Sequence, residues 1–502
     1  MARQETPLHW YSPGTLCRLG HHLAVCGDLD AAIACFDHSV ATNPSPPSVP
    51  CNLGRHLAYR GDLDAAIADF PRSSASRADL AGFHSRLLMS QLYRPGLTGE
   101  YILSEHTKFD IHHGLPILDR RPHDNSRQPG RRLKVGYVSN DFRDHAASRF
   151  FEPLLKSHDP EIVSTYCYSD TRFPDDVTAR LRGMAAVWRD TRDLMCEAMA
   201  ELIRADGIDI LVDLGGHTAG GPRMPLFARK PAPIQVTWLG YPATTGLSAM
   251  DYRIVDSITD PEGDADGASS ESLVRLGRGF LTFQPPPPPE IATSPGKDNG
   301  FLTFGSFNTI RKCTAGVIGL WSALLRRVPD ARLLLKSKYL ASPIIRRLIA
   351  EQFTRNGVAQ DRLDLLAWTP DSSSHLDCYA RIDVALDPFP YNGTTTTCEA
   401  LSQGVPVVTL AGERHSARVG ASLLTQIGLP DLVATSEADY LAIATALAED
   451  HERCGRLREE IPNRLRASTL CDGAGFARLM EAAYRVMWRR WCQGQGGAPF
   501  AL

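Results

Sequence analysis

Short apolar runs alternate with longer helical patterns over most of the chain beyond residue 130. Each run is short enough for a buried strand, and the stretches between runs show helical spacing. Regular alternation of this kind predicts a parallel, doubly wound α/β sheet. The first set of predicted strands covers residues 133–138, 162–168, 208–214 and 234–239.

A second alternating set begins at residue 301, with predicted strands at 301–307, 332–336, 363–367, 383–386 and 405–410. Between the two sets lie five consecutive prolines, Pro285 to Pro289, which form a stiff extended segment. We expect an interdomain linker there rather than a polyproline ligand for another protein. The predicted domains are a first Rossmann-like domain over 131–284, a linker over 285–300, a second Rossmann-like domain over 301–470, and C-terminal helices over 471–502.

The N-terminal region contains a repeat. The sequence from Leu19 to Phe36 recurs from Leu53 to Phe70, an offset of 34 residues, which is the period of the tetratricopeptide repeat. About two repeats are expected over residues 1–75. Two repeats are rarely stable alone. We therefore expect them to dock on the rest of the chain through a helical linker over 76–130.

Composition limits the possible functions. A chain of 502 residues is too long for one core, and its net charge of −3 argues against nucleic acid or a membrane surface as the main partner. The twelve cysteines include no CxxC pair, so no zinc ribbon or disulfide framework is indicated. The sequence shows no signal peptide and no apolar run long enough to span a membrane. We therefore expect a soluble cytoplasmic protein with no metal site.

The segment 387–401 is the most informative part of the chain. It follows a predicted strand, contains Pro388, Pro390 and Gly393, and continues with four threonines, 394–397, before a helical pattern. The start of a helix offers unpaired N–H groups and partial positive charge, so it attracts phosphate. The hydroxyls of Thr394, Thr395 and Thr396 add donors, and Glu399 is placed to bind sugar hydroxyls. A structural helix cap would need only one threonine.

Other polar residues also follow predicted strands. His145 follows the first strand of the first half, and residues 215–218, which include His217, follow its third. Asn308, Thr309 and Lys312 follow the first strand of the second half. Because ligands of such sheets bind at the carboxyl ends of strands, these residues and the threonine run predict a shared site between the halves.

Transfer of a sugar from a nucleotide donor is the chemistry that fits these side chains. Lys312 would neutralise the charge that builds on a leaving diphosphate, a task that a metal performs elsewhere. Either His145 or His217 could take the proton of an acceptor hydroxyl near neutral pH. His375 lies on a short predicted helix before the strand at 383–386 and could pack against the base.

The sequence between about 133 and 492 resembles the catalytic region of the O-GlcNAc transferase/SPINDLY family, glycosyltransferase family 41. The matching motifs lie at residues 136–145, 213–218, 231–242, 305–308, 387–401, 416–422 and 487–491. Repeats ahead of such a region are also this family's architecture. The resemblance implies a GT-B fold and inverting, metal-independent transfer to Ser or Thr hydroxyls of proteins, with no cofactor besides the nucleotide sugar.

The resemblance also implies roles for individual residues. His145 matches a histidine proposed as base or acceptor-site residue, and Lys312 matches the diphosphate-binding lysine. Thr395, Thr396 and Glu399 match phosphate- and ribose-binding positions, although the family has Asp where this chain has Glu399. His375 matches the histidine that stacks near the base.

Two departures leave the donor and the acceptor open. Animal members read Gly-His-Thr-Thr-Gly where this chain reads Gly393 followed by four threonines. The threonine version resembles SPINDLY, whose plant members use GDP-fucose, so GDP-fucose is the alternative to UDP-GlcNAc. The second departure is the short repeat array, which offers little surface for protein acceptors. A repeat-bearing scaffold without catalysis and a transferase for small molecules or lipids are further alternatives.

Overall fold

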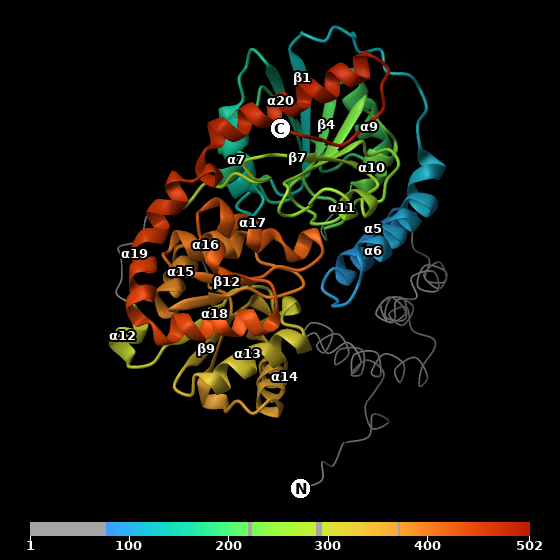
Figure 1. The fold of residues 1–502 in the computed structure, drawn as a ribbon. Helices are drawn as coiled ribbons and strands as arrows, with labels where there is room; N and C mark the ends of the chain where they lie inside the picture. Colours follow the sequence, from blue (N-terminus) through green and yellow to red (C-terminus); the bar gives the residue numbers. More distant parts are fainter. Residues whose placement is uncertain (1–76, 219–222, 288–293, 370–371) are drawn as a thin grey trace, which may run out of the picture.

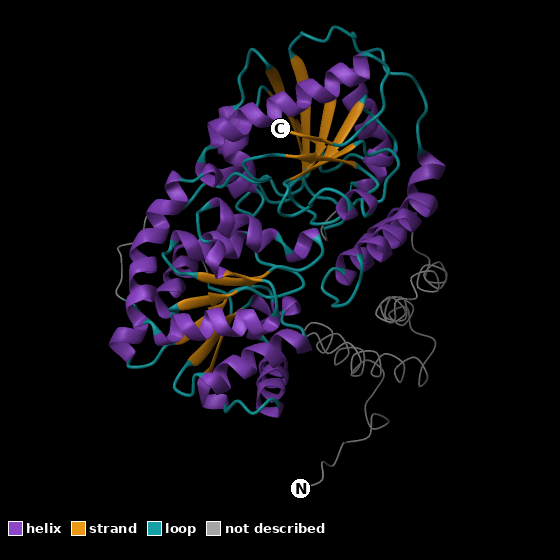
Figure 2. Ribbon diagram, viewed as in Figure 1, coloured by secondary structure: helices purple, strands orange, loops and turns teal. Residues whose placement is uncertain are grey.

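Two parallel sheets, each flanked by helices, form the two halves of the molecule (Figures 1 and 2). The computed structural model describes residues 77–218, 223–287, 294–369 and 372–502. The predicted repeats at 1–75 lie outside the described residues. The predicted class of two doubly wound α/β domains is confirmed.

The N-terminal sheet has eight strands in the order β14-β7-β6-β5-β4-β1-β2-β3, and every adjacent pair is parallel. The central strand β1 is buried along almost its whole length, as expected for a parallel strand with helices on both faces. The strands are β1 Leu133–Ser139, β2 Val163–Ser169, β3 Val187–Asp190, β4 Ile210–Asp213, β5 Ile234–Thr237, β6 Tyr252–Val255, β7 Ser272–Arg275 and β14 Phe500–Ala501.

The C-terminal sheet has six parallel strands in the order β10-β9-β8-β11-β12-β13. The chain order reverses between β8 and β11, so the loops after these two strands diverge and leave a crevice of the kind that binds ligands. The strands are β8 Thr303–Ser306, β9 Arg332–Lys336, β10 Leu363–Leu366, β11 Val384–Leu386, β12 Val407–Leu410 and β13 Val433–Ala434.

All nine predicted strands are confirmed within a few residues of their expected bounds. Five further strands, β3, β6, β7, β13 and β14, were not predicted. β6 and β7 each contain a buried arginine, Arg253 and Arg275. Arg275 is satisfied by the Asp260 carbonyl at 2.7 Å and by the Asp266 carboxylate. These partners lie between β6 and β7, Asp260 in a loop and Asp266 in the short helix Asp264–Gly267, so the strand alone does not show how its arginine is paired.

Helices cover both faces of each sheet. The N-terminal half carries α7 Ser148–Ser157, α8 Asp176–Met184, α9 Cys196–Asp206, α10 Met224–Ala228 and α11 Asp264–Gly267. The C-terminal half carries α13 Ala315–Arg327, α14 Pro343–Arg355, α15 Ser372–Asp377, α16 Thr395–Ser402, α17 Val419–Gln426, α18 Glu437–Glu449 and α19 His451–Ala467. The short helix α12 Pro295–Asn299 lies in the segment expected to be the linker.

The end of the chain returns to the N-terminal half. We expected helices over residues 471–502. The structure has one helix, α20 Gly473–Cys492, which packs on α7, and then β14, which extends the N-terminal sheet (Figure 1). The Trp488 indole donates to the Gln128 carbonyl at 3.0 Å. The chain therefore crosses between the halves twice.

A loop after β6 fastens the halves together. Ser422 donates its hydroxyl to the Asp256 carboxylate at 2.6 Å, and His415 pairs with Asp260. Burial alone would raise the pKa of Asp260, but the charges of His415 and Arg253 outweigh it and hold that pKa below its ordinary value. This contact fixes how the carboxyl ends of the two sheets face each other.

Helices α5 Arg77–Gln91 and α6 Gly99–Phe109 form a hairpin that precedes the first sheet. Figure 1 shows the hairpin beside the N-terminal half, with the turn between its helices directed toward the C-terminal half. The apolar side chains of the hairpin pack with Tyr241 and Ala243 of the N-terminal half and with Tyr391 of the C-terminal half. No helix among the described residues is both long and apolar enough to cross a membrane.

Candidate functional site

Lys312 ends the 3-10 turn Ile310–Lys312, which follows β8. Its ammonium donates to the Asn308 side-chain oxygen at 3.1 Å and to the Asn392 carbonyl at 2.6 Å. It also lies 4.4 Å from the centroid of the Tyr391 ring. Burial lowers the pKa of Lys312 to about 8, and the opposing effect of Asp387 is smaller. Lys312 is thus a fixed cation at the carboxyl end of β8.

The threonine run forms the first turn of α16, which begins at Thr395. Thr394 is the N-cap residue, but its side chain makes no capping hydrogen bond. The Thr396 hydroxyl donates to the Asn308 side-chain oxygen at 3.0 Å. One oxygen of Asn308 therefore joins Lys312 to the N-terminus of α16, where backbone N–H groups and the helix dipole favour an anion.

Gly393 lets the loop close tightly before α16. A Cβ at this position would lie 2.6 Å from the Thr397 hydroxyl and 2.7 Å from that of Thr396. The Gly393 N–H donates to the Asp387 carboxylate at 2.6 Å, and the Thr409 hydroxyl donates to the same carboxylate at 2.7 Å. Burial raises the pKa of Asp387, although these donors and Lys312 oppose the shift. The absence of a side chain at Gly393 thus allows the threonine hydroxyls to gather.

His375 and Glu399 meet on the other side of α16. His375 lies on α15 and donates from Nε2 to Glu399 Oε2 at 3.0 Å. The ammonium of Lys336 contacts His375 Nδ1 and donates to the Thr369 hydroxyl at 3.1 Å. The Tyr379 hydroxyl donates to Glu399 Oε2 at 3.4 Å. Lys336 and Tyr379 were missed from the sequence. Lys336 ends a predicted strand, so the strand-end rule could have found it.

Thr309 precedes the Lys312 turn and is partly exposed, and its carbonyl accepts from the Lys312 N–H at 3.0 Å. Asn392, also missed from the sequence, is buried between this turn and α17, where its side-chain oxygen accepts from the Gly420 N–H at 3.3 Å. The predicted residues of the second half therefore form two adjacent groups around α16. One contains Asn308, Lys312, Gly393 and Thr396, and the other contains His375 and Glu399.

His145 lies in the loop after β1, with 40% of its side chain exposed. Burial lowers its pKa, and the nearby Asp141 opposes that shift. Two groups compete for its Nδ1: the Ala147 N–H at 3.3 Å and the Asp141 carboxylate at 3.7 Å. Only a proton on Nδ1, directed at Asp141, leaves Nε2 free to accept. In the hydrogen-bonded arrangement Nδ1 accepts from the Ala147 N–H, so a proton on Nδ1 requires that contact to give way to Asp141.

His217 follows β4 and is fully buried. Its Nε2 donates to the Thr245 carbonyl at 2.8 Å, and its Nδ1 accepts from the Ser85 hydroxyl of α5 at 3.0 Å. Burial lowers the pKa of His217 to about 4. Gly216, at φ 56°, precedes it, and a Cβ there would lie 2.2 Å from the Tyr241 side chain. In this arrangement both ring nitrogens are engaged, and the ring joins α5 to the sheet.

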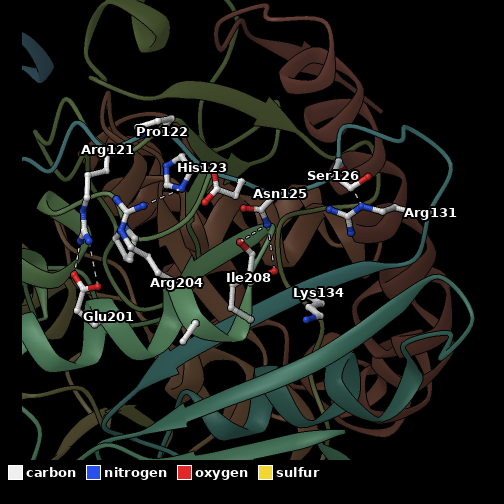
Figure 3. A pocket seen from close by; sticks show the side chains of 14 residues that line it. Arg121, Pro122, His123, Asn125, Ser126, Arg131, Lys134, Glu201, Arg204 and Ile208 are labelled. Atoms are coloured by element: carbon white, nitrogen blue, oxygen red, sulfur yellow. Dashed lines mark hydrogen bonds and ion pairs between the residues drawn. The ribbon is translucent and has the colours of Figure 1, made fainter.

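A cavity of about 710 Å³ lies elsewhere, at the amino ends of β1 and β4 (Figure 3). Its cations already have partners. Arg131 pairs with Asp209, Arg121 with Glu201, and Lys134 donates to the Asp206 carbonyl at 2.8 Å. The last contact caps the C-terminus of α9, where a cation is stabilising. These contacts stabilise the fold and account for the charged residues of the cavity, so we assign no ligand to it. In the part of the chain described, no three His, Cys, Asp or Glu side chains gather as metal ligands would.

The two facing α/β halves, with the start of α16 and Lys312 at the carboxyl ends of adjacent strands, have a GT-B glycosyltransferase architecture. The family model for glycosyl transferase family 41 matches residues 101–283 and 295–480. The chain belongs to this family.

Relatives of known name and a solved structure agree with this family assignment. Over 380 residues the chain is 42% identical to a probable UDP-N-acetylglucosamine–peptide N-acetylglucosaminyltransferase SPINDLY of Oryza sativa, and the match covers 75% of this chain. The corresponding protein named SEC of Arabidopsis thaliana is 30% identical over 403 residues, or 78% of this chain. The matches span 41% and 40% of those relatives' lengths. A mutant of the Thermobaculum terrenum O-GlcNAc transferase superimposes with a TM-score of 0.82 at 37% identity, covering 96% of this chain and 92% of that chain.

Proposed function

We propose that the protein transfers N-acetylglucosamine from UDP-GlcNAc to Ser or Thr hydroxyls of proteins, with inversion and without a metal. The observation that carries the proposal is the Asn308 side-chain oxygen, which accepts from both Lys312 at 3.1 Å and Thr396 at 3.0 Å. It places a lysine ammonium beside the start of a helix. Both features stabilise negative charge on a diphosphate. The names of the plant relatives and of the T. terrenum enzyme support the sugar and the protein acceptor.

The proposed reaction replaces one bond at C1 of the sugar by another. The acceptor oxygen forms a bond to C1 of the sugar on the face opposite the diphosphate, and the bond from C1 to the diphosphate oxygen breaks. The electron pair of that bond leaves with the diphosphate, where Lys312 and the N–H groups of Thr395 and Thr396 stabilise it. The hydroxyl proton passes to Nε2 of His145, while Asp141 stabilises the imidazolium that forms.

The remaining predicted residues hold the nucleotide. His375 is 25% exposed, and its ring is fixed between Glu399 and Lys336, so one face is available to a base. Thr309, Gly393 and Thr394 line the approach to the diphosphate. We assign His217 a positioning role, because both its nitrogens are hydrogen-bonded and burial lowers its pKa to about 4.

GDP-fucose is the second candidate donor. Thr394 stands where animal family members have a histidine, and it makes no side-chain capping hydrogen bond in this structure. Its hydroxyl can therefore turn toward the sugar or the phosphate. Since this position lies beside the leaving group, it is a reasonable site of discrimination between the two donors.

The deciding experiment supplies both donors to the same protein. Purified protein is incubated with radiolabelled UDP-GlcNAc or GDP-fucose and a mixture of candidate acceptor proteins, and modified peptides are identified by mass spectrometry. Transfer of a mass increment for N-acetylhexosamine to Ser or Thr supports the proposal, and one for deoxyhexose supports the alternative. Neither transfer nor donor hydrolysis at high enzyme concentration would contradict both and favour a binding scaffold.

A further inference from the structure

Tyr93, in the turn between α5 and α6, reaches the loop that holds Lys312. Its ring stacks on that of Tyr391, with centroids 5.1 Å apart and an interplanar angle of 24°. The neighbouring Arg94 carbonyl accepts from the Arg414 guanidinium at 3.1 Å. The turn thus touches the C-terminal half at two points, although its helices pack on the N-terminal half.

Tyr391 in turn contacts Lys312. The ammonium lies 4.4 Å from the centroid of the Tyr391 ring, a distance at which a ring attracts a cation. The next residue, Asn392, accepts from the same ammonium through its carbonyl at 2.6 Å. Two of the three groups that hold the ammonium are therefore consecutive residues of one loop, and the third is Asn308.

We propose that Tyr93 is a positioning residue for nucleotide binding, which acts by holding Tyr391 and its loop against Lys312. The inference rests on the proposed function, because it assigns Lys312 to the diphosphate. It goes further in making the segment ahead of both catalytic halves part of the donor site. A nucleoside diphosphate would then bind fully only when the α5–α6 hairpin is docked.

The packing around Tyr93 fits this role. Burial raises the pKa of the Tyr93 phenol to about 12, so it remains neutral and its ring provides shape rather than charge. Loss of the ring would open Tyr391 and Lys312 to water on that side. Water would stabilise the charged ammonium and bring the pKa of Lys312 back toward its ordinary value. Both the position and the titration of Lys312 should therefore respond to Tyr93.

The test is a double-mutant cycle on nucleotide binding in the full chain. The variants are Tyr93→Leu, which keeps an apolar side chain, Tyr93→Phe, which keeps the ring, Tyr391→Leu, and the double leucine variant. Leu103→Ala is the matched control, since it truncates a partly buried apolar side chain of the other helix of the hairpin, outside the cluster that contains Tyr391. Calorimetry measures the Kd for UDP and GDP between pH 6.5 and 9.5, and thermal unfolding shows that each variant is folded.

We expect Tyr93→Leu and Tyr391→Leu each to weaken binding about tenfold, and the double variant to be no weaker than Tyr391→Leu alone, because both act through one contact. Tyr93→Phe and Leu103→Ala should stay within twofold of wild type. In wild type, nucleotide binding should weaken at high pH as Lys312 loses its proton. In Tyr93→Leu this weakening should begin at a higher pH, whereas in Tyr93→Phe it should begin at the same pH as in wild type.

Three results would overturn the inference. Additive losses in the double variant would show that the two rings act independently. Unchanged binding and an unchanged pH limb in folded Tyr93→Leu would show a purely structural role for the ring. A wild-type protein that binds neither UDP nor GDP would remove the proposed function as well, so the two failures can be told apart.

Discussion

The C-terminal half holds its predicted residues in hydrogen-bonded groups around one helix, whereas the N-terminal half places its two predicted histidines in contrasting environments. The side-chain oxygen of Asn308 accepts hydrogen bonds from both Lys312 and Thr396. His145 is 40% exposed, and His217 is fully buried with both nitrogens engaged. Under the proposed function, the fold itself assembles the donor side, while the acceptor side offers one accessible histidine of the two that were predicted.

This difference is expected if the halves bind what the proposed function assigns to them. A diphosphate has a fixed size and charge, so a prearranged cation and helix start can match it before it arrives. An acceptor polypeptide varies in sequence and supplies its own hydroxyl, so the protein needs to provide a base and space. The donor side should therefore be sensitive to small changes, and the acceptor side should depend on one residue.

The largest effect is expected for Lys312→Ala. Removal of the cation that stabilises the leaving diphosphate should reduce kcat/KM about a thousandfold. Turnover of the preferred nucleotide sugar measures it, and Lys338→Ala, which removes an exposed lysine of the same half, is the control. A folded Lys312→Ala protein with near wild-type turnover would contradict this expectation, because the donor side would then not depend on its central cation.

His145→Ala tests the acceptor side and should lower kcat about a hundredfold, because general-base catalysis contributes that much or more. The Kd for the nucleotide should stay within twofold, since no contact joins His145 to the donor groups among the described residues. Asp141→Asn should cost about tenfold in kcat by losing the orientation of His145. Exposed His451 provides the control substitution. An equal loss of nucleotide affinity in His145→Ala would assign His145 to the donor instead.

A smaller effect is expected from pH. Because burial lowers the pKa of Lys312 to about 8, the free enzyme loses its ammonium as the pH rises through that value. The profile of kcat/KM, which reports groups of the free enzyme, should therefore fall about fivefold between pH 8 and 9 and about tenfold between pH 9 and 10. Below neutrality, His145 gains a proton only beneath its ordinary range, because its pKa is lowered. A profile that stays flat to pH 10 would show that Lys312 keeps its charge in the free enzyme.

The contrast between the halves also explains how far the sequence could predict the molecule. Strands such as β1 and β9 were found because they are buried on both faces and read as continuous apolar runs. Lys312 and the threonine run were found because a strand end places them at the crevice. Apolar runs and polar residues at strand ends are local patterns, so they can be recognised in a single sequence.

Other features depend on partners far away in the chain. Ser85 and His217 are 132 residues apart, and no local pattern shows that a hydroxyl of α5 would engage the ring. Tyr93 reads as an ordinary aromatic near a helix end, yet it stacks on Tyr391 of the C-terminal half. Strand β7 was missed for the same reason. Its Arg275 donates to the Asp260 carbonyl, and the residues of the strand itself do not show that this partner exists.

The smallest effect on turnover is expected for His217→Ala, which asks whether the N-terminal half has a second chemical group. Its loss leaves the Thr245 carbonyl and the Ser85 hydroxyl without their partner and removes a buried ring, so the free energy of unfolding should fall by about 2 kcal/mol. Turnover at 25 °C should stay within threefold, because the ring holds α5 in place and neither nitrogen is free to take a proton. Denaturant unfolding measures the first quantity and initial rates measure the second. Ser85→Ala, which removes the other partner of the same bond, should reproduce about half of the stability loss. If His217→Ala were folded and a hundredfold slower while Ser85→Ala kept full activity, the buried histidine would be the base, and the accessible His145 would belong to acceptor binding.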